Sequence, residues 1–221
     1  MGTRFTALAL TLLASACSSS GTAPTDTAAP ANAAVALEAT QTRPLAVGQM
    51  APDASVLSAD GRHVRLSERL SRAPTLLVVY RGGWCPYCTA HLAELARIEK
   101  DLTGMGLQIL AVSPDRPELL AQEGYAKGTE FNYELLSDQN IELARAFGLA
   151  FQVDAPTVEL YRGYGIDLQQ ASGRPHQVLP VPAVYMIDSS GQIRFAHANP
   201  DYRERLDGAA VLAAARTMMG G

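Results

Sequence analysis

The stretch TLLVVYRGGWCPYC, residues 75–88, decides the fold. Its first half is apolar and rich in leucine and valine without polar alternation, which is typical of a strand buried on both faces. From Pro86 to about Leu102, apolar residues recur at spacings of three and four, which predicts a helix. Cys85 and Cys88 therefore lie where a buried strand passes into a helix.

The start of a helix changes the chemistry of a thiol. Unpaired backbone N–H groups and aligned peptide dipoles favour a negative charge there, and the thiolate is the form that attacks disulfides and peroxides. Pro86 fits the first helical position because its fixed φ suits the helix. Cys88 then lies three residues beyond Cys85 on the same side, where it can resolve a mixed disulfide formed by Cys85. The pair is predicted to be redox-active.

Other interpretations of the pair stay open. A structural disulfide would close a very short loop, which restricts the unfolded chain little. A zinc site needs four ligands, and the sequence has no second cysteine pair. The cysteines could also pack in a core without chemistry. A non-enzymatic alternative is a metal chaperone that holds a soft cation such as copper(I), although Met105 is too far along the helix to complete its site.

The first sixteen residues are predicted to be a secretory signal peptide. An apolar stretch at 5–13 follows one cation and precedes Ala14-Ser15-Ala16, which is the usual order of such signals. Residues 12–17 resemble the lipobox of bacterial lipoproteins, although alanine stands where leucine is usual three residues before the cysteine. The resemblance implies lipidation of Cys17, and Ser18 suggests a tether to the outer membrane on its periplasmic side. Ordinary cleavage and secretion is the alternative.

The composition favours one exported domain on a tether. The 221 residues include 18 basic and 22 acidic side chains, a formal net charge of −4, which argues against a nucleic-acid partner. Residues 17–43 are mostly small or polar and are expected to form a flexible tether. Residues 44–221 have the size of one domain. Of three cysteines, only the close pair remains after lipidation, whereas structural disulfides usually join distant segments.

The rest of the pattern predicts alternating strands and helices. A second buried strand over 107–112 and the strand before Cys85 enclose one helix, as in a right-handed βαβ unit. The other expected elements are, in order, a hairpin over 56–66, helices over 118–126 and 140–147, a loop over 149–180, a hairpin over 183–196 and a helix over 207–218. Because long loops are usually functional or disordered, the loop is expected to wall the site or to decorate the surface.

This order of elements resembles the thioredoxin fold over residues 45–218. More narrowly, five motifs resemble peroxiredoxin-like members of the alkyl hydroperoxide reductase/thiol-specific antioxidant family: YRGGWCPYC (80–88), AVSPD (111–115), LSD (136–138), AFG (146–148) and VPA (181–183). The resemblance implies an α/β protein, a thioredoxin-like three-layer α/β/α sandwich with a mixed central sheet and an N-terminal β-hairpin extension. It also implies a cofactor-free enzyme that reduces hydroperoxides or protein disulfides with electrons from a thioredoxin-like partner. A disulfide reductase without peroxidase activity is the alternative.

The likeness to thioredoxins assigns the first cysteine the attacking role. It implies that Cys85 is the nucleophile and that Cys88 resolves. Pro182 matches the cis-proline that faces the cysteines in thioredoxins, and its peptide bond would leave the Val181 backbone free to pair with an extended substrate. The buried acid of thioredoxins is replaced here by Val79, so proton transfer must use another group or water.

The likeness to peroxiredoxins implies a different nucleophile. Their peroxidatic cysteine aligns with Cys88, while Cys85 takes the place of the motif threonine and Arg81 that of its proline. His91 occupies the position of a glutamate that is often found in peroxiredoxins. Pro182 occupies the position of their arginine, which binds peroxide. The loss of this threonine and arginine weakens fast peroxidase chemistry and leaves slower peroxide reduction by a low-pKa dithiol.

Five further side chains have a functional and a structural interpretation. Trp84 could shield the outer sulfur and dock substrate, or be a core aromatic. Arg81 could stabilise a thiolate or orient a peroxide, or be a solvated surface cation. His91 could relay protons, but is more simply a helix-surface histidine. Tyr161 and Tyr164 could belong to a lid over the site.

Overall fold

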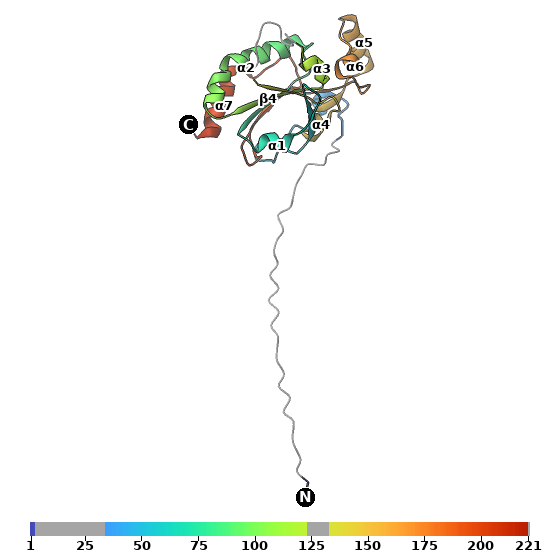
Figure 1. Cartoon of the computed structure of the whole chain (residues 1–221). Helices are drawn as coiled ribbons and strands as arrows, with labels where there is room; N and C mark the ends of the chain where they lie inside the picture. Colours follow the sequence, from blue (N-terminus) through green and yellow to red (C-terminus); the bar gives the residue numbers. More distant parts are fainter. Residues whose placement is uncertain (3–33, 123–132, 221) are drawn as a thin grey trace.

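Helices cover both faces of a seven-stranded sheet in the computed structural model of the chain (Figure 1). The structure describes residues 1–2, 34–122 and 133–220. The strands are, in spatial order, β2 (His63–Arg65), β1 (Ser55–Ser58), β5 (Glu134–Ser137), β4 (Gln108–Ser113), β3 (Thr75–Val79), β8 (Ala183–Ile187) and β9 (Ile193–Ala198). Strands β1 and β2 pair antiparallel, and β1 also pairs with β5, so the hairpin extends one edge of the sheet.

Strand β3 separates two hydrophobic cores. It is parallel to β4 and antiparallel to β8, so the sheet is mixed. Helices α2 (Pro86–Gly104) and α7 (Gly208–Met219) pack on one face of the sheet. Helices α1 (Leu66–Leu70) and α4 (Glu142–Ala146) pack on the other. Leu76 and Val78 pack in the core beneath α2 and α7, whereas Leu77 and Val79 pack in the core beneath α1 and α4. The predicted three-layer sandwich, with its βαβ unit, is confirmed.

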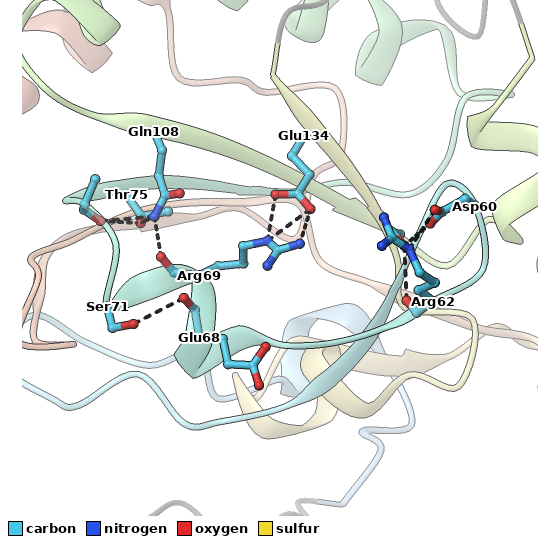
Figure 2. A network of polar contacts seen from close by, with 10 residues as sticks. Asp60, Arg62, Glu68, Arg69, Ser71, Thr75, Gln108 and Glu134 are labelled. Atoms are coloured by element: carbon cyan, nitrogen blue, oxygen red, sulfur yellow. Dashed lines mark hydrogen bonds and ion pairs between the residues drawn. The ribbon is translucent and has the colours of Figure 1, made fainter.

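Polar contacts between α1 and the strands fix one end of the sheet (Figure 2). Arg69 on α1 forms an ion pair with Glu134, with its Nε 2.9 Å from Oε2. The side-chain amide of Gln108 donates to the Arg69 carbonyl at 2.5 Å and to the Thr75 hydroxyl at 2.8 Å. Thr75, Gln108 and Glu134 are the first residues of three neighbouring strands. Helix α1 therefore ties these strands together at one end, and the site forms at the other.

The segment over 149–180 is not the long loop that was predicted. It contains β6 (Ala150–Gln152), α5 (Ala155–Gly163), α6 (Leu168–Ser172) and β7 (Val178–Pro180), and β6 pairs antiparallel with β7. Asp154 caps α5 by accepting a hydrogen bond from the Thr157 N–H at 2.8 Å, and Asp167 caps α6. The prediction was wrong because elements this short show too few turns for periodicity to appear, although their caps are visible in the sequence.

The tether prediction was also wrong near its end. The Ala36 N–H donates to the Ala150 carbonyl at 2.9 Å, a short 3-10 helix follows at Ala39–Gln41, and the Arg43 N–H donates to the Gly148 carbonyl at 3.0 Å. The folded domain thus begins before residue 44, because these backbone hydrogen bonds, with Val35 and Ala39 packed against the core, need no long apolar run.

Two other predictions fall partly or wholly outside the described residues. The signal peptide and Cys17 lie in residues 3–33. The helix predicted over 118–126 begins as α3 (Pro117–Leu120), and its second half falls in residues 123–132. Within the described parts of the chain, no helix has the length and apolar character needed to cross a membrane.

Gly148 is expected to be essential for the packing of the N-terminal segment. It adopts φ +68°, and a Cβ there would lie 2.0 Å from the Arg43 carbonyl oxygen. We therefore expect Gly148→Ala to lower the free energy of unfolding by about 1–3 kcal/mol or more, the cost of a strained backbone position. Denaturant titration measures this. Gly104→Ala, where no atom lies within 4 Å of the added Cβ, is the control, and equal unfolding free energies for the two variants would contradict the prediction.

Candidate active site

The cysteine pair begins helix α2, as the sequence predicts. Cys85 caps the helix in an extended conformation (φ −90°, ψ 113°), and Pro86 is the first helical residue. The N–H groups of Cys88 and Thr89 donate to the Cys85 carbonyl at 3.0 and 3.1 Å. Both cysteines are free thiols and only 1% exposed. A substrate must therefore be small, or must displace part of the surface, to reach either sulfur.

The turn before the pair is shaped by a glycine and a buried acid. Gly82 adopts φ +146°, and a Cβ there would lie 2.3 Å from Trp84 Nε1, so glycine is required. The Gly83 N–H donates to Asp115 Oδ2 at 2.7 Å, and Asp115 is 1% exposed just after β4. Asp115 thus holds the turn that presents Cys85. In the sequence this acid is visible only as the last residue of the AVSPD motif, which does not indicate its role.

Arg81 is buried among three aromatic rings. Its Cζ lies 4.0 Å from the ring centroid of Tyr202, 5.1 Å from that of Trp84 and 5.4 Å from that of Tyr161, and its Nη2 donates to the Tyr161 hydroxyl. These are cation–π distances. The residue is 3% exposed, so the prediction of a solvated surface cation was wrong. Tyr161 comes from α5, which therefore walls this side of the site, whereas Tyr164 is exposed.

The two thiols differ in acidity. The Cys85 thiolate accepts a hydrogen bond from the Cys88 thiol, which lowers the pKa of Cys85 to about 6; burial opposes this shift, and the positive charge of Arg81 adds to it. Burial raises the pKa of Cys88 well above the ordinary thiol value, and its hydrogen bond to Cys85 acts in the same direction. The pair therefore carries one negative charge on Cys85 and one proton on Cys88 at neutral pH.

Arg205 is a site residue that the sequence did not reveal. Its Nη2 lies 3.2 Å from Cys88 Sγ, and the two residues are 117 positions apart. It comes from the loop between β9 and α7, which also supplies the Tyr202 ring against Arg81. No local motif marks this arginine, because only the packing of α7 beside α2 brings its loop to the cysteines.

His91 is buried, contrary to the prediction of a helix-surface histidine. It is 6% exposed on the face of α2 that carries Cys88, and burial, together with the charge of Arg205, lowers its pKa to about 4. It lines a cavity of about 10 Å³ with Val79, Pro182 and Arg205. A space of this size holds about one water molecule. The prediction was wrong because apolar spacing alone does not show that the neighbouring loop covers this position.

Val181 and Pro182 lie at the site without forming the predicted docking edge. All described peptide bonds are trans, so the expected cis bond before Pro182 is wrong. The Val181 N–H donates to the Leu149 carbonyl at 2.9 Å, which continues the pairing of β7 with β6. The Val181 N–H is therefore not free to donate to a substrate strand. Both residues are buried, and Pro182 contributes to the wall of the small cavity.

A larger cavity of about 400 Å³ lies beside the turn. Its lining includes Gly83, the half-buried Trp84, Asp115, Leu119 and Ile166. Trp84 thus separates this cavity from Arg81 and stacks obliquely on Tyr161 at 5.9 Å between ring centroids. Across residues 34–122 and 133–220, no group of three or more histidines, cysteines or acids is arranged to hold a metal ion.

Comparison with known proteins connects this geometry to a family. The sequence profile of the AhpC/TSA family matches residues 47–196. A putative peroxiredoxin bcp of Haemophilus influenzae is 34% identical over 106 residues, which cover 48% of this chain and 66% of that protein. The thiol-disulfide oxidoreductase ResA of Geobacillus thermodenitrificans is 26% identical over 156 residues, covering 70% and 71%. The solved structure of reduced Prx3 in complex with hydrogen peroxide from Vibrio vulnificus has a similar fold (TM-score 0.62, 20% identity, 77% and 99% covered).

Proposed function

The chain belongs to the AhpC/TSA family, and from this membership and the geometry of its cysteine pair we propose that it is a thiol-dependent peroxidase. Cys85 is the attacking sulfur and Cys88 the resolving sulfur. The observation that carries this assignment is the asymmetry of the pair, in which the pKa of Cys85 is lowered to about 6 while Cys88 keeps its proton. A thiolate at neutral pH is the form that attacks peroxides.

The reaction proceeds in two chemical steps. The Cys85 thiolate attacks one oxygen of the hydroperoxide, the O–O bond breaks, and the other oxygen leaves as an alcohol or water after taking a proton. Cys88 then attacks the sulfenic acid on Cys85, which forms the disulfide and releases water. A thioredoxin-like thiol protein returns two electrons and restores both thiols. No cofactor takes part.

Burial of the sulfurs supports a small substrate. Both cysteines are 1% exposed, and the partly buried Trp84 and Tyr202 pack against the core cluster that contains them. Hydrogen peroxide or the peroxide end of a small organic hydroperoxide can enter such a site, whereas a protein disulfide must first displace the cover. Arg81 and Arg205 supply positive charge next to the reacting atoms, which compensates in part for the peroxiredoxin threonine and arginine that the motif lacks.

Protein-disulfide reduction is the second candidate function. Tyr87, between the two cysteines, is 44% exposed and packs edge-on against Tyr202 at 5.7 Å between centroids. An exposed aromatic residue next to a nucleophile can contact a partner protein. The likeness to ResA, which is named a thiol-disulfide oxidoreductase, extends over 70% of the chain. Both functions use the same chemistry at Cys85.

A stopped-flow comparison distinguishes the two functions. The reduced protein is mixed with hydrogen peroxide in one series and with an oxidised thioredoxin-fold protein in another, with free cysteine as the control thiol. We expect the rate constant for peroxide to exceed that of free cysteine by about tenfold or more near pH 7, because Cys85 is mostly thiolate there and two cations flank the pair. A rate constant equal to that of free cysteine would exclude the peroxidase function and leave disulfide reduction.

We also propose that the protein is exported. The support is the sequence order of residues 1–16 and the lipobox-like stretch that ends at Cys17. In this proposal the diacylated Cys17 tethers the domain to the periplasmic side of the outer membrane, through residues 18–34. Mass spectrometry of the N-terminal peptide from the native membrane fraction tests it, since an unmodified Cys17 would contradict the lipid anchor.

A further inference from the structure

The two sulfurs of the pair lie near two arginines. The charge of Arg81 helps to lower the pKa of Cys85, and Arg205 adds a smaller effect there. Arg205 Nη2 also lies 3.2 Å from Cys88 Sγ. Within the described residues, neither arginine forms an ion pair with a carboxylate, whereas the exposed Arg203 does so with Asp201 at 2.8 Å. The charges of Arg81 and Arg205 are therefore left to act on the sulfurs.

The loop that carries Arg205 is anchored at both ends. At its start, the Asn199 N–H donates to the Pro182 carbonyl at 3.2 Å. At its end, the Gly208 N–H donates to Glu94 Oε1 at 2.6 Å, and Glu94 belongs to α2, the same helix as Cys88. Because the loop is fixed to the helix of the cysteine pair, its arginine keeps its place beside Cys88 without a carboxylate to hold it.

We propose that Arg205 is a catalytic residue of the second chemical step, in which it stabilises Cys88 as a thiolate after Cys85 has been oxidised. This inference rests on the proposed order of attack. In the reduced pair, burial, the shared hydrogen bond and the negative charge on Cys85 keep the proton on Cys88. Once Cys85 carries an oxygen atom, that charge is gone. Arg205 then remains as the cation in contact with Cys88 Sγ and opposes the effect of burial.

The step balances without a further oxidant. The peroxide has already oxidised Cys85 to the sulfenic acid by two electrons. The Cys88 thiolate attacks Cys85 Sγ, the S–S bond forms, and the S–O bond breaks. The hydroxide that leaves takes up the proton released by Cys88 and departs as water. With a mixed disulfide on Cys85 in place of the sulfenic acid, the same attack releases the substrate thiolate.

The other titratable groups around Cys88 do not supply this charge. His91, one turn along α2, has a pKa lowered to about 4 by burial and is neutral in the working range. His197 and Glu204 line the small cavity together with His91 and Arg205, and neither forms a hydrogen bond to Cys88 among the described contacts. The effect of Arg81 on the pKa of Cys88 comes from a hydrogen bond with the Arg81 backbone and not from the guanidinium charge. Among the described side chains, Arg205 is thus the cation that contacts this sulfur.

Single-turnover kinetics of Arg205→Gln test the proposal. The reduced full chain is mixed with excess hydrogen peroxide, thiol loss is followed in time, and sulfenic acid is trapped with dimedone. Because Arg205 also lowers the pKa of Cys85 slightly, both steps are measured at about pH 8, where Cys85 is ionised in either protein and we expect the first step to change little. We expect disulfide formation to slow by about 10- to 100-fold, the usual contribution of a hydrogen bond to a charged group, so that sulfenic acid accumulates. The pH midpoint of the second step should also move upward.

Matched variants make the result specific. Arg203→Gln removes a neighbouring exposed arginine and should leave both steps unchanged. Arg205→Lys keeps the charge and should restore part of the second step. Arg205→Met also removes the charge and should show the same slow second step. The test can therefore still be made with this variant if Arg205→Gln does not fold. Slowing of the first step alone, or no change in either step, would overturn the proposal. A slow first step in the wild-type chain would instead contradict the peroxidase function, and the second step would then be compared on a mixed disulfide formed at Cys85.

Discussion

Replacing Cys85 with serine is expected to abolish peroxide reduction. The hydroxyl of serine does not ionise at neutral pH, and the remaining thiol at Cys88 is buried with a pKa raised well above the ordinary value. We expect the rate of peroxide consumption to fall by at least about a thousandfold, the scale seen when an enzyme loses its nucleophile. Stopped-flow measurement of peroxide loss with the reduced variant gives this rate directly.

Cys88→Ser is the matched variant. Serine can still donate a hydrogen bond to the Cys85 thiolate, so the first attack should survive and one equivalent of peroxide should be consumed per chain. Without a resolving thiol, turnover then stops at the sulfenic acid, which dimedone traps. The reverse outcome, fast attack in Cys85→Ser and none in Cys88→Ser, would show that Cys88 is the nucleophile, as the alignment with peroxiredoxins implies. Thermal unfolding of both variants controls for loss of structure.

Replacing Arg81 with methionine is expected to change the pH dependence of the first step. The positive charge of Arg81 helps to lower the pKa of Cys85 to about 6, so its removal should raise that pKa. A nearby opposite charge shifts a pKa by about 1–3, so at about pH 5 the thiolate fraction and the rate should fall roughly tenfold or more. Well above both pKa values, Cys85 is ionised in either protein and the rates should converge.

Two comparisons control for the packing of Arg81. Arg81→Lys keeps a positive charge within the rings of Trp84, Tyr161 and Tyr202 and should retain most of the low pKa. Tyr161→Phe removes the hydroxyl that accepts from Arg81 Nη2 and should have a smaller effect. The measurements are the ultraviolet absorbance of the thiolate and the peroxide rate, both as functions of pH. A rate reduced by the same factor at every pH in Arg81→Met would indicate a packing defect and contradict the electrostatic role.

The features that could be predicted from the sequence are those with a local pattern, and the features that were missed depend on contacts between distant residues. The buried strand before Cys85 and the helix after it were predicted because their signals are local: an unbroken apolar run, a proline at the first helical position and apolar spacing over several turns. The elements over 149–180 were missed because each is too short to show a period. The segment at 35–43 was placed in the tether because its contacts are backbone hydrogen bonds and the packing of single small apolar residues, which composition does not reveal.

The same distinction applies to the residues of the site. Cys85 and Cys88 were identified from four adjacent residues, and the family motifs around them are short runs of consecutive residues. Burial of Arg81 and His91 was missed because it depends on which distant segments cover them. The prediction that the Val181 backbone is free was wrong for its N–H, which already donates to the Leu149 carbonyl next to β6.

By itself, the sequence determined the fold class and the position of two thiols at a helix start, since both follow from patterns within a few consecutive residues. Only the tertiary structure decided how the two sulfurs differ. Asp115 reaches the turn from the next strand, Tyr161 closes on Arg81 from α5, and Arg205 meets Cys88 from 117 residues away. The charge around a buried sulfur depends on the side chains that packing brings to it, and packing joins residues that are far apart in the chain.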